Sequence, residues 1–131
     1  MSIAYGPKKI IRAASGGANH VSTDSGDATC LGRSCDLSLY NFASIQLVWS
    51  GLGGTPNGTA TVEVSEDGTN WDTKKIEVAG ASVDAVIALS GAAGNDTLSI
   101  ETVTERYYRV SYVKGTTTGG SIDCILMAKG S

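Results

Sequence analysis

One stretch, residues 59–71, limits what this chain can fold into more than any other part of its 131 residues. Its first seven residues alternate between apolar and polar side chains, with Val62 and Val64 among the apolar positions. This period of two is typical of a half-buried β-strand. Asp67-Gly68 follows as a strong turn signal, because glycine adopts positive φ at little cost and aspartate tolerates it. The stretch therefore predicts a strand, a turn and the start of a second strand.

The same period of two recurs along the rest of the chain, and no segment sustains a helical period of 3.6 residues. Alternating apolar positions occur in residues 36–42, 44–50, 83–89, 98–103, 106–113 and 121–128. The 17 glycines fall largely between these segments, and residues 90–97 are expected to form a loop. Short strands separated by turn signals are typical of an antiparallel sandwich or barrel. We expect one all-β domain, an antiparallel, jelly-roll-like β-sandwich of about eight to ten strands.

Four large side chains, together with the Asp67-Gly68 turn, are expected to determine this fold. Trp49 and Tyr108 are in phase with the apolar positions of their strands, which predicts that both are buried. Trp71 is expected to cover the sandwich edge with its ring buried and its N–H near a partner. Arg109 could pair with a carboxylate on an adjacent strand or project into an interface, and the structural pairing is the preferred interpretation.

The N-terminal segment, residues 1–13, has two interpretations. It carries Ile3, Tyr5, Ile10 and Ile11, and an apolar-rich terminal segment that cannot fold alone often docks on a partner. It is equally well interpreted as the first strand of the same sandwich. Residues 14–131 are expected to form the sandwich itself.

Charge and hydropathy exclude several classes of protein. Ten basic and 13 acidic residues give a net charge of −3 without a basic stripe, which argues against nucleic-acid binding. No apolar run approaches the ~18 residues that span a bilayer, so no membrane association is expected. The N-terminus has no long apolar stretch like that of a signal peptide. We therefore expect synthesis and folding in a cytoplasm.

Few residues are suited to metal or redox chemistry. Cys30, Cys35 and Cys124 are the only cysteines, and His20 is the only histidine. Chains of the cytosol rarely keep disulfides, and a metal site needs more ligands than these, so three reduced thiols are expected. No cofactor is expected.

The candidate catalytic and calcium-binding residues are better explained as ordinary turn and loop residues. Glu66, Asp67 and Asp72 could form a carboxylate pair for acid–base work, but such residues are common in Asp-Gly turns. Asp84 with Asn95-Asp96 could offer oxygen ligands to calcium, but the spacing is not that of a regular calcium loop. We therefore expect no catalytic residues and no enzyme.

The aromatic residues leave a choice between core and binding site. Trp71, Tyr107, Tyr108 and Tyr112 could form a platform on which a sugar ring stacks. The preferred interpretation is that they fill the core and the strand edges.

The order of these pieces resembles that of small phage virion proteins, which are sandwich or jelly-roll modules that decorate capsids or build fibres and tails. Four elements carry the resemblance: residues 44–49, residues 62–71, residues 107–112, and a Gly/Thr hairpin before an apolar last strand. It covers roughly residues 37–129. The hairpin Ser-Glu-Asp-Gly-Thr-Asn-Trp also looks like that of discoidin-type and carbohydrate-binding sandwiches.

The resemblance implies a non-enzymatic structural protein of the virion, made in the host bacterium. A capsid decoration or auxiliary head protein that stabilises or studs the shell is the first hypothesis. Its partners would be the major capsid protein or another virion protein, and copies of itself, with a trimer favoured. The alternative is a carbohydrate-binding module on a phage fibre or tail or at a cell surface, for which a glycan would be the ligand.

Overall fold

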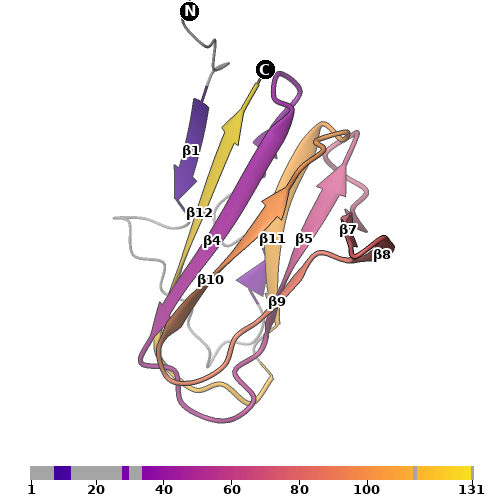
Figure 1. Cartoon of the computed structure of the whole chain (residues 1–131). Helices are drawn as coiled ribbons and strands as arrows, with labels where there is room; N and C mark the ends of the chain where they lie inside the picture. Colours follow the sequence, from indigo (N-terminus) through magenta and orange to yellow (C-terminus); the bar gives the residue numbers. More distant parts are fainter. Residues whose placement is uncertain (1–7, 13–27, 30–33, 114, 131) are drawn as a thin grey trace, which may run out of the picture.

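The computed structural model describes residues 8–12, 28–29, 34–113 and 115–130, all of them in strands, turns and loops without a helix. Two antiparallel sheets face each other (Figure 1). The four-stranded sheet has the order β1 (Lys8–Arg12), β12 (Ser121–Lys129), β4 (Phe42–Ser50) and β10 (Gly94–Ile100). The second sheet has the order β2 (Ala28–Thr29), β11 (Tyr107–Val113), β5 (Thr59–Ser65) and β6 (Asp72–Thr73), with β3 (Cys35–Asp36) on β11 and β9 (Val86–Ala88) on β5. The prediction of an antiparallel β-sandwich is confirmed.

The core lies between the two sheets and follows the predicted alternation. In the four-stranded sheet the buried side chains include Ile45, Leu47, Trp49, Ile122, Cys124 and Leu126; in the second sheet they include Val62, Val64, Tyr108, Val110 and Tyr112. Tyr108 and Tyr112 are fully buried, so these two rings belong to the core and not to a surface platform. Burying apolar area at roughly 25 cal/mol per Å² makes this interface the main source of stability.

The buried indole of Trp49 explains one glycine. Gly94 lies opposite Trp49 in the β10–β4 register. A Cβ atom on Gly94 would lie 2.8 Å from Cζ2 of the indole, which is closer than carbon atoms approach. Glycine at the start of β10 therefore leaves room for the ring against the sheet.

The prediction of a strand over residues 36–42 is wrong. Only Cys35–Asp36 pairs with β11, and the chain then turns. The Tyr40 amide donates to the Leu37 carbonyl at 3.0 Å, and the Asp36 carboxylate accepts from the Ser38 amide at 2.9 Å. This local hydrogen bonding replaces a ladder, and Leu39 is left 77% exposed.

Three other boundaries differ from the sequence prediction. The loop expected over residues 90–97 is wrong in its second half, because β10 begins at Gly94 and pairs with β4 through Asn95 and Asp96. The strand expected over residues 98–103 ends at Ile100. The strand expected over residues 83–89 is interrupted at Ala85, whose amide bonds to the Lys74 carbonyl and whose carbonyl bonds to Val62.

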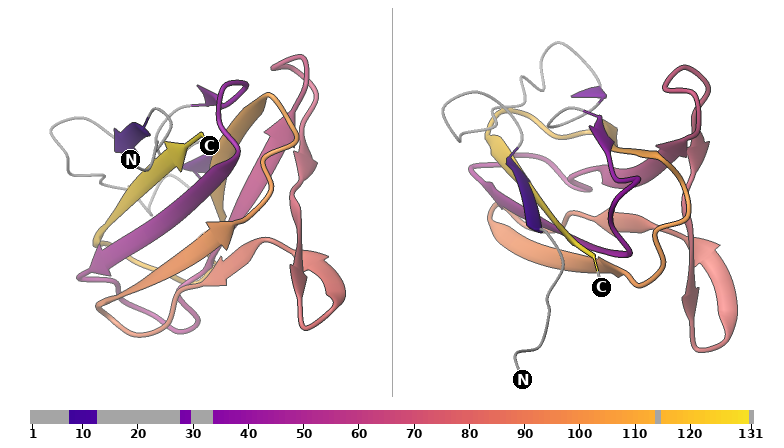
Figure 2. Two further views of the ribbon diagram at one scale, coloured as in Figure 1. Left: turned by 45° about the horizontal axis from the view of Figure 1, so that its top comes forward. Right: turned by 90° about the horizontal axis from the view of Figure 1, so that it is seen from above.

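The interruption releases a small hairpin from the sandwich. Strands β7 (Lys75–Val78) and β8 (Ala81–Asp84) pair only with each other among the described strands. Figure 2 shows this hairpin projecting from the side of the sandwich, and Figure 1 places it on the side away from β1. The turn at its tip has positive φ at Ala79 and Gly80, as type I′ hairpin turns require.

The segment Lys8–Arg12 forms β1 and pairs antiparallel with β12, with Ile10 opposite Met127 and Ile11 opposite Leu126. In this structure it is the edge strand of the four-stranded sheet. Ile3 and Tyr5, the other two residues of the predicted interface, lie outside the described residues, as do Cys30 and His20.

Candidate interaction surface

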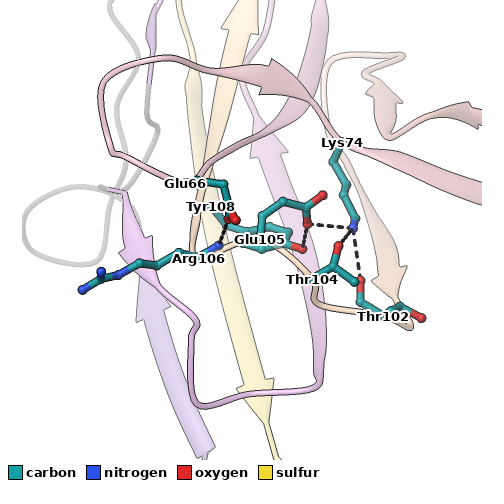
Figure 3. Close-up of polar contacts among 7 residues, drawn as sticks. All are labelled: Glu66, Lys74, Thr102, Thr104, Glu105, Arg106 and Tyr108. Atoms are coloured by element: carbon teal, nitrogen blue, oxygen red, sulfur yellow. Dashed lines mark hydrogen bonds and ion pairs between the residues drawn. The ribbon is translucent and has the colours of Figure 1, made fainter.

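Polar clusters at one end of the sandwich have structural roles, and the most unusual is built around Lys74. This lysine is buried, with 6% of its surface exposed. Its ammonium donates to the Glu105 carboxylate at 2.9 Å, to the Thr102 carbonyl at 3.1 Å and to the Thr104 hydroxyl at 3.4 Å (Figure 3). All three donors of the ammonium thus have partners, which is the condition for burying a charge.

Tyr108 completes this cluster from the core side. Its hydroxyl donates to Glu105 at 2.5 Å. Burial and this hydrogen bond to a carboxylate raise the pKa of Tyr108 far above its usual value. Burial raises the pKa of Glu105, but hydrogen bonds from Tyr108 and Lys74 outweigh it, so the net shift is downward. The three groups satisfy one another and join the second sheet to the segment between β10 and β11.

Asp67 holds the predicted turn together. Its Oδ1 accepts from the amides of Thr69 and Asn70, each at 2.8 Å, and from the Ser65 hydroxyl at 3.0 Å. These hydrogen bonds hold the pKa of Asp67 well below its usual range. Gly68 adopts φ of 76°, the left-handed conformation the turn needs. The carboxylate is thus fully engaged by the turn, which favours the structural interpretation over acid–base work.

Arg109 lies on the outer face of β11, where its guanidinium Nε donates to the Glu63 carboxylate at 2.7 Å. Glu63 is its direct partner on β5, so the carboxylate does come from an adjacent strand. The guanidinium also stacks on the half-buried Trp71, 4.0 Å from the ring centroid. A second arginine, Arg106, lies over the Tyr107 ring at 5.0 Å. Guanidinium groups therefore cover both outward-facing rings, which argues against an open platform for sugars.

The outer face of the four-stranded sheet carries several exposed apolar side chains. Val48 and Phe42 on β4 are each 40% exposed, and Met127 on β12 is 38% exposed. Half-buried Ile125 lies between them, opposite Gln46. Charged positions border these residues, with Asp123 opposite Val48 and Lys129 opposite Phe42 in the register. Apolar side chains bordered by polar positions are typical of a surface that contacts another protein.

A shallow hollow of about 320 Å³ opens on this face. Its lining comes from the ends of three strands: Phe42, Ala43, Ser44, Ser99, Ile100, Glu101, Met127 and Lys129. Lys129 and Glu101 are the charged residues of this lining. We call Phe42, Val48, Ile125 and Met127 the outer apolar face.

The described part of the chain also bears on metal binding, membrane insertion and disulfide formation. Within it, no group of three His, Cys, Asp or Glu side chains is placed to hold a metal ion. Asp84 instead forms an ion pair with Lys75. The same residues include no helix long and apolar enough to cross a membrane. Cys35 and Cys124 are buried and form no disulfide.

The fold has a counterpart of known structure. It is similar to the crystal structure of the SPBc2 prophage-derived protein YomS, with a TM-score of 0.66 over 99% of both chains. The two sequences are 8% identical, so the likeness shows a shared fold. No protein-family model matches the chain, and no curated protein matches it significantly.

Sequence reasoning missed two features of these surfaces. No pattern in the sequence marks Lys74 as buried, and only its place between two strand segments buries it. Phe42 and Met127 lie out of phase with the buried residues of their strands, and this phase was the signal that could have located the outer apolar face.

Proposed function

We propose that this chain is a non-enzymatic structural protein of a bacteriophage particle, a capsid decoration or auxiliary head protein. The outer apolar face is the observation that carries the proposal, because it gives the sandwich a surface for a coat subunit. The shared fold with a prophage-derived protein supports the phage setting. The hydrogen-bonded state of Asp67, Glu105 and Tyr108 supports a role without catalysis.

The protein would act by binding the coat, without a chemical step. Phe42, Val48 and Met127 would lose their exposed area against the coat, and each bound copy would stabilise the assembled shell by mass action. Association of the copies into a small ring, with a trimer favoured, would multiply weak single contacts.

Purified phage particles test this proposal. Mass spectrometry should find the protein in the particles, and electron microscopy should place it on the head. Phe42→Glu with Met127→Glu should lower its occupancy on the shell by at least about tenfold, because two charges would be buried against the coat. Val113→Glu is the control, since Val113 is similarly exposed, at 48%, but lies on the second sheet. Absence of the protein from the particles would contradict the proposal.

A further inference from the structure

A groove separates the projecting hairpin from the four-stranded sheet. Its walls are residues 74–78, along β7, and residues 98–102, at the end of β10, and its volume is about 520 Å³. Among the described strands β10 pairs only with β4, and β7 pairs only with β8. Each wall therefore contains a strand with an unpaired edge. Such edges are templates for another extended segment.

The hairpin is amphipathic, and the sandwich covers only part of its apolar face. Alternation places Ile76, Val78, Ala81 and Val83 on one face, and Lys75, Glu77, Ser82 and Asp84 on the other. Ile76 and Leu98, one from each wall, are partly buried against the core. Val78, however, is 54% exposed and Val83 is 39% exposed. The apolar face continues past the part that the sandwich covers.

The charges at the groove are acidic once the ion pairs are taken into account. Lys74 is neutralised by Glu105 and Lys75 by Asp84. Glu77 and Glu101, one from each wall, have no ion-pair partner among the described residues. The groove therefore fits an extended segment that is both apolar and positively charged.

We propose that this groove receives the N-terminal strand, residues 8–12, of a second copy of the chain. That segment, Lys-Lys-Ile-Ile-Arg, combines three positive charges with two isoleucines, which complements Glu77, Glu101 and the apolar side chains of the groove. Each wall contributes five residues and the strand has five, so the lengths agree. The proposal rests on the proposed function only in specifying how copies of the chain would associate there.

Strand exchange also improves the pairing of this segment. In the isolated chain, β1 is an edge strand with β12 on one side only. Between β10 and β7 of a neighbour it would have a strand on both sides. Residues 13–27 join β1 to β2, and fifteen residues extend at most about 50 Å. The radius of gyration of a folded domain of this size is about 14 Å, so the connection is long enough to reach another copy.

Charge reversal of the full-length protein tests the exchange, with sedimentation equilibrium as the readout. Glu77→Lys with Glu101→Lys, and separately Lys8→Glu with Lys9→Glu, should each weaken self-association by at least about tenfold. A chain carrying all four substitutions should associate within about threefold of the unaltered protein, because opposite charges again face each other. Higher salt should weaken association of the unaltered protein.

Asp72→Lys is the control, since it reverses one exposed carboxylate, on β6 and outside the groove. It should leave association unchanged. Amides of residues 98–100 should exchange with solvent more slowly in the oligomer than in the charge-reversed monomers. The proposal would be overturned if the unaltered protein stayed monomeric or if the charge reversals left self-association unchanged. It would also be overturned if the chain with all four substitutions did not regain self-association.

These results are separable from the test of the proposed function. Monomeric protein on the phage head would contradict strand exchange alone. Charge-dependent self-association of a protein that is absent from particles would contradict only the virion role.

Discussion

At the scale of single residues, the buried lysine is the least expected feature. Lysine is rarely buried unless it is paired, because moving an ammonium out of water costs several kcal/mol. Lys74 meets this condition with three oxygen partners from residues 102–105, a segment far from it in sequence. Its contribution is to link the second sheet to the connection between β10 and β11.

Replacement of Lys74 by alanine should therefore destabilise the fold. We expect a loss of about 2 kcal/mol in the free energy of unfolding, below the usual value for a fully buried pair, because Glu105 is partly exposed to solvent. Urea denaturation measures this change. Lys75→Ala is the adjacent control, and it should cost less than about 0.5 kcal/mol, since the Lys75–Asp84 pair is exposed. Equal losses for both variants would show that burial of Lys74 contributes nothing.

At the scale of elements, the β5–β6 hairpin depends on one ionised side chain. The Asp67 carboxylate accepts three hydrogen bonds at Oδ1 and a fourth at Oδ2 from the Asn70 side chain, which lowers its pKa in the folded state. A group whose folded pKa is lowered stabilises the fold above its unfolded pKa. This stabilisation is lost as the pH falls towards the folded value.

The pH dependence of an Asp67→Asn variant should reveal this contribution. At pH 7 the variant should unfold at lower urea concentration than the unaltered protein, because a neutral amide accepts hydrogen bonds more weakly. The difference between the two midpoints should narrow as the pH falls below about 4, because Asp67 then becomes protonated in the unfolded chain while its lowered pKa keeps it ionised in the folded protein. Asp72→Asn, on the exposed start of β6, is the control and should show no such narrowing. A difference that is independent of pH would contradict this account of the turn.

At the scale of the whole molecule, the two sheets share one core and should unfold together. Leu47 is fully buried between them, whereas Leu39 is 77% exposed in the turn after β3. Leu47→Ala should lower the free energy of unfolding by about 2 to 5 kcal/mol, with one cooperative transition. Leu39→Ala makes the same chemical change and should alter the free energy of unfolding by less than about 0.5 kcal/mol. Fluorescence and circular dichroism should give coincident transitions, and separate transitions would indicate that the sheets fold independently.

The buried faces of the strands show where prediction from the sequence succeeded. The faces of β4, β5, β11 and β12 were predicted correctly, because a period of two in apolar residues reports directly which side of a strand is buried. The segment 36–42 shows the same period, yet it forms a turn. There, hydrogen bonds from Ser38 and Tyr40 to nearby residues compete with strand pairing, and periodicity contains no information about that competition.

The amino-acid sequence alone determined the class of fold, the antiparallel pairing around the Asp67-Gly68 turn, and the inward set of side chains. These follow from local rules of backbone conformation and alternation. Tertiary structure decided the burial of Lys74, the release of the β7–β8 hairpin at Ala85, and the unpaired edges of β7 and β10. Each of these depends on which distant segments become neighbours, and that depends on packing between sheets rather than on any pattern within one strand.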